Sequence, residues 1–462
     1  MKPTLFKTKN GNTYLYSPVK KRILPIPEHL SDLNLNSYVE DRFGRYLFDN
    51  NYLDEYNETY EVRIDKTDIN SALANVPQII FEMTSQCNLR CKYCCYNDCY
   101  TTFQNRKSGV LSFDIAKTVI DFIATKCDAV QNRSVNTPII FSFYGGEPLL
   151  YGENIKKIVQ YVKTKNFHNR TIRFSITTNG TLIHNYIDFL AENQFAVLVS
   201  LDGNASHNAN RVFPNGTPSF DKVVNNLKIC QNRYPDYFKT IRFNAVYTKL
   251  SDMDEMIKFF LSTFNKYPTI SPLHEAQEEA DNVSIIKELY KKILPTTNEK
   301  HKFAPDFFLE IPIHKQIAHI LTKLLQGSYI FEWQFNEEDA PKMPTSTCIP
   351  FTKKLYVTAT GDLIQCEKID RSAPLGKVQK DKVLIDTEAI ATQFNRKIYN
   401  NIRQCSKCYF QQACNQCVFL IDKHCSQFMS QEMFANKLSE VFTYIENNPS
   451  VVELIKNNLI LH

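Results

Sequence analysis

The chain has 462 residues, enough for two or three domains with a sizeable core, and its 43% hydrophobic and 22% charged residues are ordinary for a globular protein. A net charge of +5 without a basic run gives no sign of nucleic-acid binding, and no apolar stretch of about 18 residues predicts a membrane span. The first residues lack the apolar core of a secretory signal, so we expect a cytoplasmic protein, in which 14 cysteines favour metal sites over disulfides.

Residues 1–75 predict a small N-terminal α+β domain. A β-hairpin is expected from residues 11–18 and 21–26, where two short runs rich in apolar residues flank a turn. Charged, tyrosine-rich segments follow, among them residues 38–60. One interpretation is an extension that only covers the domain after it.

Strand-like runs alternate with amphipathic stretches from residue 76 to residue 273. Ile155, Ile158, Val159 and Val162, for example, have helical spacing. Such alternation predicts a parallel sheet with crossover helices, and barrels of this type carry their chemistry at the C-terminal ends of the strands. Six strands are too few for a complete eight-stranded barrel. The predicted strands are 78–83, 138–144, 171–177, 195–201, 240–247 and 268–273.

Three cysteines directly follow the first of these strands. Cys87, Cys91 and Cys94 are separated by three and then two residues, so a tight loop can turn three thiolates onto one metal centre. Soft sulfur ligands select zinc or iron–sulfur clusters. A closed zinc site needs four ligands, and neighbouring Cys95 and Cys99 keep a zinc knuckle open as an alternative.

Glycine and polar residues end the next strands. Gly145 and Gly146 let the backbone approach a ligand closely, and the carboxylate of Glu147 beside them can accept hydrogen bonds from an ammonium group. Thr178 lies in the Thr-Thr-Asn-Gly end of the third strand. These residues are therefore candidates for a binding site at the barrel mouth.

The fourth strand adds a polar pair. Ser200 and Asp202 are two residues apart, so both side chains point to one face of the strand. Arg211 follows, and its planar guanidinium can donate two parallel hydrogen bonds to a carboxylate.

The remaining cysteines form a second pattern. Residues 274–347 predict a helical bridge, including a helix over 311–325, and residues 429–462 predict one or two C-terminal helices. Between them, a hairpin with a turn at Gly361 separates two cysteines, and five more follow. Taken alone, this spacing also fits a pair of zinc ribbons. The seven are Cys348, Cys366, Cys405, Cys408, Cys414, Cys417 and Cys425.

These motifs together resemble the radical S-adenosylmethionine (SAM) enzymes that carry a C-terminal SPASM domain. The resemblance covers about 350 residues, from Pro77 to Cys425. It implies a partial (β/α)6 TIM-like barrel over 76–273 and a SPASM domain over 348–428. It also implies three [4Fe–4S] clusters, one of which binds SAM through an iron without a protein ligand.

The resemblance assigns the candidate residues. Cys87, Cys91 and Cys94 would hold the SAM-binding cluster. The Gly-Gly-Glu element would hold the amino group of SAM, Ser200 and Arg211 its carboxylate, and Asp202 would lie near its ribose. The segment between Gly203 and His207 is one residue shorter than in the family. The complete predicted SAM contacts are Tyr93, Gly145, Gly146, Glu147, Thr178, Ser200, Asp202 and Arg211.

The C-terminal cysteines would hold two auxiliary clusters. Cys405, Cys408, Cys414 and Cys425 would ligate one completely. Cys348, Cys366 and Cys417 would ligate the other, and because no cysteine lies between the first two, that cluster has an open iron or a non-cysteine ligand. One inner spacing, between Cys414 and Cys417, is one residue shorter than in the family. Cys127 and Cys230 lie on apolar helix faces and are expected in the core.

The resemblance also implies the function. We expect an enzyme that matures a ribosomally made precursor peptide by hydrogen abstraction with a 5′-deoxyadenosyl radical, forming a thioether or carbon–carbon crosslink. Residues 1–75 resemble a leader-peptide recognition domain in arrangement, and flavodoxin or ferredoxin is the expected reductant. The alternatives are an anaerobic sulfatase maturase, which makes formylglycine, and a non-catalytic zinc or electron-transfer protein.

Overall fold

The computed structural model describes residues 1–31, 40–57, 60, 63–94, 96, 108–134, 136–273, 288–290, 312–325, 343, 345–369, 371–421 and 424–460. The chain forms two compact units. The barrel unit comprises Ile64–Lys292 and Cys348–Thr392, and the terminal unit comprises Met1–Arg63, Ile293–Thr347 and Gln393–His462. The five domains expected from the sequence stay predictions, and the expected bridge lies largely outside the described residues.

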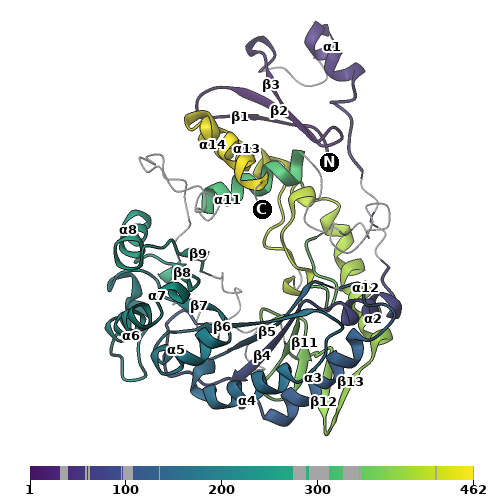
Figure 1. The fold of residues 1–462 in the computed structure, drawn as a ribbon. Helices are drawn as coiled ribbons and strands as arrows, with labels where there is room; N and C mark the ends of the chain where they lie inside the picture. Colours follow the sequence, from purple (N-terminus) through teal and green to yellow (C-terminus); the bar gives the residue numbers. More distant parts are fainter. Residues whose placement is uncertain are drawn as a thin grey trace. The chain divides into compact units, whose positions relative to one another are not determined.

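A sheet of ten strands is the frame of the barrel unit (Figure 1). Six of its strands lie side by side in chain order and pair in parallel. This confirms the predicted partial barrel. The six strands are β4 (Gln78–Thr84), β5 (Pro138–Gly145), β6 (Thr171–Thr178), β7 (Ala196–Ser200), β8 (Arg242–Tyr247) and β9 (Thr269–Pro272).

Helices connect these strands and lie along the outer side of the sheet (Figure 1). Side-chain caps fix several helix starts: Ser112 Oγ accepts a hydrogen bond from the Ile115 amide at 3.2 Å, and Asp252 accepts one from the Glu255 amide at 3.0 Å. The helices are α2 (Lys66–Ala74), α3 (Phe113–Cys127), α4 (Gly152–Lys163), α5 (Ile183–Glu192), α6 (Phe220–Arg233), α7 (Pro235–Phe238) and α8 (Met253–Phe264). Two 3-10 turns, η4 (Pro148–Tyr151) and η5 (His207–Asn210), follow strand ends.

Four strands from the later part of the chain extend the same sheet. β10 (Leu355–Val357) pairs in parallel with β4, and β11 (Asp362–Ile364) returns antiparallel to it, as the predicted hairpin requires. A second hairpin, β12 (Gly376–Gln379) and β13 (Lys382–Ile385), completes the edge. The segment that carries Cys348 and Cys366 is thereby attached beside the strand that leads to the first cysteine loop.

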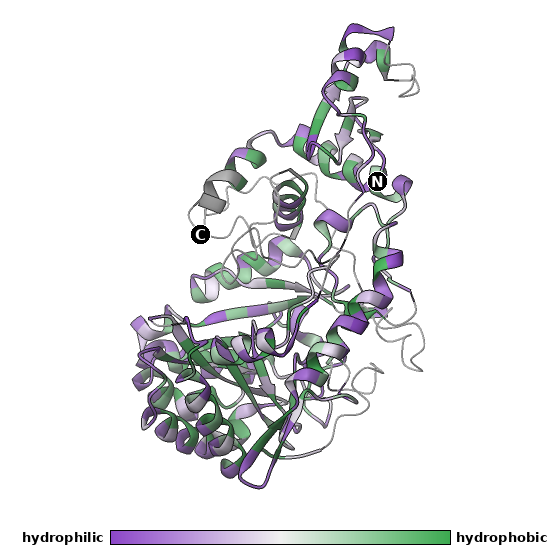
Figure 2. Ribbon diagram, turned by 90° about the vertical axis from the view of Figure 1, so that its right-hand side faces the viewer, coloured by the Kyte–Doolittle hydropathy of each residue, from purple (hydrophilic) through white to green (hydrophobic). Residues whose placement is uncertain are grey.

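The two faces of the barrel sheet differ in polarity. Phe81, Phe141 and Phe143 are buried on one face and their rings pack together. On the other face, Gln78 donates to Ser142 (2.7 Å), which shares a hydrogen bond with Ser175 (2.6 Å). Figure 2 shows the strands largely green and the surrounding helices banded purple and green, as expected for an apolar sheet covered by amphipathic helices. The predicted core residues Cys127 and Cys230 are fully buried.

The terminal unit combines both ends of the chain. Its antiparallel sheet of β1 (Thr4–Lys7), β2 (Thr13–Ser17) and β3 (Arg22–Ile26) contains the predicted hairpin, and Phe6 and Tyr14 pack against Phe442. Within the described residues, no helix of the chain is long and apolar enough to cross a membrane. The other elements are η1 (Glu28–Leu30), α1 (Arg42–Asp49), α11 (Pro312–Leu325), η6 (Gln411–Ala413), η7 (Val418–Leu420), α13 (Gln431–Asn447), α14 (Ser450–Ile460) and most of α12 (Thr387–Cys405).

Candidate functional site

The first cysteine loop begins directly after β4 and is fastened at two points. The amide of Arg90 donates to the Val212 carbonyl (2.7 Å), and the amide of Lys92 donates to the Asn210 carbonyl (3.0 Å). Leu89, Cys91 and Tyr93 are buried together with Leu273 at the end of the barrel. The loop is therefore held at the C-terminal end of the sheet, where the sequence predicts the chemistry.

Three thiols gather in this loop. Cys91 is buried, and Cys87 and Cys94 are partly exposed. Burial raises the pKa of Cys87 to about 12, and the neighbouring carboxylate of Glu147 and the other two thiols add to the shift. Burial likewise raises the pKa of Cys91 to about 11, although the nearby Arg211 guanidinium opposes the shift. The thiols raise one another's pKa, and three thiolates in one loop repel one another unless a cation lies between them. Three cysteines in one loop therefore suit a positively charged metal centre.

The two glycines after β5 are required by close backbone packing. Gly145 has a φ of +128°, and a Cβ there would lie 2.4 Å from the Thr84 carbonyl oxygen. A Cβ on Gly146 would lie 2.0 Å from the carbonyl oxygen of Gln86. In the structure, these glycines approach the residues that lead into the cysteine loop, and the predicted approach to a ligand stays a prediction.

Glu147 and Thr178 lie together at the ends of β5 and β6. The buried Glu147 carboxylate accepts hydrogen bonds from Thr178 Oγ1 (2.8 Å), the Asn179 amide (2.7 Å) and the Leu149 amide (3.1 Å). Burial raises the pKa of Glu147 to about 7, and the three donors oppose that shift. This carboxylate therefore fixes the strand-end backbone, and its predicted contact with an ammonium group stays a prediction.

Asp202, Arg211 and Tyr93 form one buried network. Asp202 accepts a hydrogen bond from the Tyr93 hydroxyl, pairs with Arg211 Nε at 3.2 Å and accepts from the Val246 amide at 3.0 Å. Arg211 Nη1 also lies 3.7 Å from Cys91 Sγ, and its guanidinium lies 5.5 Å from the centre of the Tyr93 ring. The shortened segment before His207 thus still delivers Arg211 to the cysteine loop. Ser200 ends β7, in register with Asn244 of β8.

Asn179 is a contact of the cysteine loop that the sequence analysis did not single out. Its side-chain amide donates to Cys87 Sγ at 3.6 Å. The sequence indicated a role for Asn179 only through its position in the Thr-Thr-Asn-Gly strand end, beside the predicted contact Thr178.

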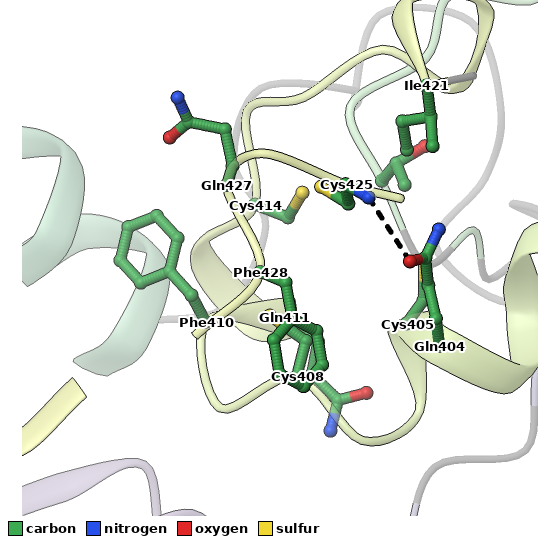
Figure 3. Close-up of a pocket in the computed structure, with 11 residues that line it drawn as sticks. Gln404, Cys405, Cys408, Phe410, Gln411, Cys414, Ile421, Cys425, Gln427 and Phe428 are labelled. Carbon is green, nitrogen blue, oxygen red and sulfur yellow. Dashed lines mark hydrogen bonds between the residues drawn. The ribbon is translucent and has the colours of Figure 1, made fainter. Parts of the chain in front are cut away.

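A second set of thiols lies in the terminal unit. Cys405, Cys408, Cys414 and Cys425 line one cavity (Figure 3), and their assignment as one four-ligand set stays a prediction. Backbone amides donate to two of the sulfurs: Met429 to Cys408 and Gln416 to Cys414, both at 3.4 Å.

The surroundings of this cavity are apolar and ordered by hydrogen bonds. Phe410, Phe428 and Ile421 complete much of the lining, and the Cys425 amide donates to Gln404 Oε1 at 3.2 Å (Figure 3). Burial raises the pKa of Cys405 to about 12 and that of Cys414 to about 11, with the neighbouring thiols adding to both shifts. Like the loop, this set suits a cationic centre that takes four sulfur ligands.

The third predicted set is divided between the units. Cys348 and Cys366 belong to the barrel unit, and Cys417 belongs to the terminal unit. Burial raises the pKa of Cys366 to about 11, and its thiol donates to Glu367, which pairs with Lys354 at 2.6 Å. This set stays a prediction. Among the residues that the structure describes, none of the three cysteine sets has three side chains already arranged to hold a metal ion, so all three ligand sets stay predictions.

Parts of this chain are similar to a known protein family and to curated proteins. Residues 81–260 match the family described as the Radical SAM superfamily. The cysteine-type anaerobic sulfatase-maturating enzyme of Clostridium novyi (strain NT) is 30% identical over 213 residues, which are 45% of this chain and 54% of that protein. The radical SAM cyclopropyl synthase TigE of Paramaledivibacter caminithermalis is 26% identical over 231 residues, 47% of this chain and 45% of that protein. The chain thus spans about half the length of these curated relatives.

A solved structure extends the likeness at the level of the fold. Native anSMEcpe with bound AdoMet and Cp18Cys peptide superposes with a TM-score of 0.53 at 20% identity. The match covers 82% of this chain and 99% of that one. The arrangement of strands and helices is therefore shared beyond the segment that matches the family.

Proposed function

We propose that this chain, whose residues 81–260 match the Radical SAM superfamily, is a maturase that modifies a ribosomally made peptide by forming a thioether or carbon–carbon crosslink. The observation that carries the proposal is the buried contact of the cysteine loop with the Tyr93–Asp202–Arg211 network at the C-terminal end of the barrel strands. The match of residues 81–260 to an enzyme superfamily speaks against a non-catalytic zinc or electron-transfer protein.

The loop thiols of Cys87, Cys91 and Cys94 would hold a [4Fe–4S] cluster, and the strand ends would surround SAM. When bound, this pair of cofactors supplies a 5′-deoxyadenosyl radical that takes a hydrogen atom from the substrate. Leu89 and Leu273 pack around the loop and exclude water from its inner side. Arg211, whose Nε pairs with Asp202, would bind the carboxylate of SAM through its other guanidinium donors.

The other cysteines would hold two auxiliary clusters, as expected from the sequence. Cys405, Cys408, Cys414 and Cys425 would supply four ligands to one, which their shared cavity supports. Cys348, Cys366 and Cys417 would supply three to the other. A count of three clusters, a flavodoxin or ferredoxin reductant, leader recognition by residues 1–75 and a cytoplasmic location are further parts of this proposal.

A peptide substrate is supported by the neighbour of the same fold, which was solved with AdoMet and a peptide bound. A second candidate function is anaerobic sulfatase maturation, because curated relatives of this chain are sulfatase-maturating enzymes. The two functions share the radical step and differ in the product. A crosslink keeps the sulfur or carbon skeleton and loses a pair of hydrogen atoms, whereas formylglycine replaces the side-chain group by an aldehyde.

The test begins with SAM cleavage by anaerobically purified protein and dithionite, followed by chromatography of deoxyadenosine. We expect cleavage by the wild type and none by Cys91→Ala, because two thiolates are too few to hold the loop cluster. Cys230→Ala, which removes a fully buried thiol on α6, is the matched control and should retain cleavage. Deoxyadenosine formation by Cys91→Ala at the wild-type rate would refute the assignment.

The product assay then separates the two candidates. The open reading frames beside the gene are first searched for a short cysteine- or glycine-rich precursor. The enzyme is then incubated with that peptide and, separately, with a sulfatase-derived peptide, and both are analysed by mass spectrometry. A crosslinked precursor supports the first function. An aldehyde on the sulfatase peptide, with the precursor unchanged, supports the second.

A further inference from the structure

The sulfur of Cys87 receives a hydrogen bond from a side chain outside the cysteine loop. Asn179 Nδ2 lies 3.6 Å from Cys87 Sγ and 2.9 Å from Asn88 Oδ1, so its two hydrogens are shared between the sulfur and the loop. Asn179 is buried, with 7% of its surface exposed. Water therefore only weakly screens the electrostatic effect of this N–H donor on the Cys87 sulfur.

The orientation of this amide is fixed by its other end. Asn179 Oδ1 accepts hydrogen bonds from the Thr181 amide (2.9 Å) and from Thr181 Oγ1 (2.6 Å), so the oxygen faces Thr181 and the nitrogen faces the sulfur. A flipped amide would set an oxygen against Cys87 and Asn88 Oδ1 and would lose both donors from Thr181. These hydrogen bonds therefore identify which terminal atom of the Asn179 side chain is the nitrogen and which is the oxygen.

The turn that carries Asn179 is itself anchored. Asn226 of α6 donates to the carbonyl oxygens of Gly180 (3.2 Å) and Thr181 (2.7 Å), and all three residues at this anchor are buried. Asn88 donates in turn to Thr181 Oγ1 at 2.8 Å. The amide of Asn179 is thus held by β6, α6 and the loop at once, and its distance to the sulfur is set by the fold.

We propose that Asn179 is a positioning residue that raises the reduction potential of the cluster held by Cys87, Cys91 and Cys94. This inference rests on the proposed function. A reduced cluster carries one more negative charge, much of it on sulfur, and an N–H donor stabilises the reduced form more than the oxidised form. Removing the donor therefore lowers the potential and makes reduction by the electron donor less favourable.

The test is a redox titration of the holoenzyme followed by electron paramagnetic resonance. The loop cluster is recognised as the reduced signal that changes when SAM is added. Asn179→Leu keeps the approximate shape and removes the N–H donor without adding a charge, and Asn179→Ala removes the side chain. The matched control is Asn193→Ala at the opposite end of α5, where the amide contacts Lys163 and the Phe189 carbonyl.

We expect the equilibrium constant for reduction of the loop cluster to fall about tenfold in both Asn179 variants, a shift of about 59 mV for a one-electron couple. The potential of Asn193→Ala should equal that of the wild type. If Asn179→Ala fails to assemble the cluster, the nearly isosteric and uncharged Asn179→Leu carries the measurement. An unchanged potential in an Asn179 variant with an intact loop cluster would overturn the inference, while an iron-free wild type would overturn the proposed function as well.

Discussion

Glu82 and Arg371 form a buried ion pair in the barrel unit. The two guanidinium nitrogens of Arg371 lie 2.9 and 3.0 Å from the two carboxylate oxygens, and the side chains are only 6% and 1% exposed. Glu82 also accepts hydrogen bonds from Tyr96, two residues after Cys94, and from the Ala359 amide. One carboxylate on β4 thus holds both the end of the cysteine loop and the segment that follows Cys366.

This pair leads to a prediction about stability. Arg371→Met leaves the Glu82 carboxylate buried without its cation, so we expect the free energy of unfolding to fall by about 3–5 kcal/mol. The double variant Glu82→Gln/Arg371→Met should recover part of the loss, since no charge then remains uncompensated. Urea denaturation followed by circular dichroism measures all three proteins.

The control for that experiment is an exposed ion pair. Lys239 and Asp236 lie 2.7 Å apart with side chains 76% and 91% exposed, and Lys239→Met should change stability by less than about 0.5 kcal/mol. A loss in Arg371→Met no larger than in Lys239→Met would show that the buried pair contributes nothing to folding.

At the scale of elements, a single carboxylate joins the N-terminal sheet to α13. Glu446 accepts hydrogen bonds from the side chains of Thr8 (3.2 Å), Asn10 (2.8 Å), Asn12 (3.0 Å) and Tyr14 (2.9 Å). Burial alone raises the pKa of Glu446, but the four donors outweigh it, so the pKa lies below its usual value. The ionised form is therefore the one that holds the sheet.

The sign of that shift predicts a pH dependence. A carboxylate with a lowered pKa contributes stability above its unfolded pKa of about 4.3, and the contribution is lost as the pH falls through the folded value. We expect hydrogen exchange in β1 and β2, corrected for intrinsic rates, to accelerate in the wild type as the pH falls below about 4.

Two variants isolate Glu446 as the cause. Glu446→Gln should show faster exchange of the same strands already at pH 7 and little further change on acidification. Glu440→Gln, at an exposed position of the same helix, should behave like the wild type. Equal exchange in Glu446→Gln and the wild type at both pH values would assign the docking of the sheet to its other contacts with α13, among them the Phe6–Tyr14–Phe442 packing and the Ser439 hydroxyl that donates to the Lys7 carbonyl.

The ends of the barrel strands could be predicted to within about two residues, because each strand is an apolar run with turn residues on both sides. The edge strands β12 and β13 were missed, since each has only four residues and half of its side chains face solvent. The parallel pairing of β10 with β4 joins residues some 280 positions apart, and no local pattern encodes such a contact. The same reason explains Asn179: a strand-end asparagine is common, and only the fold brings it to Cys87.

At the scale of the whole molecule, the candidate thiols belong to separately packed parts of the chain. The loop of Cys87, Cys91 and Cys94 is built entirely within the barrel unit, and the cavity of Cys405, Cys408, Cys414 and Cys425 is built entirely within the terminal unit. Each set is held by contacts of its own unit. Loss of one cluster should therefore leave the other assembled.

We predict that the protein purified without oxygen is brown and contains iron, about twelve atoms per chain if all three clusters are present. Cys408→Ala/Cys414→Ala removes two of the four cysteines that line the cavity of the terminal unit, so iron should fall by about one third while SAM cleavage by the barrel unit persists. Cys230→Ala, a cysteine outside every set, should keep the full iron content. Metal analysis together with the deoxyadenosine assay checks both halves of the expectation. Stoichiometric zinc in a colourless protein would refute the cluster assignment, and abolished SAM cleavage in the double variant would refute the independence of the two sets.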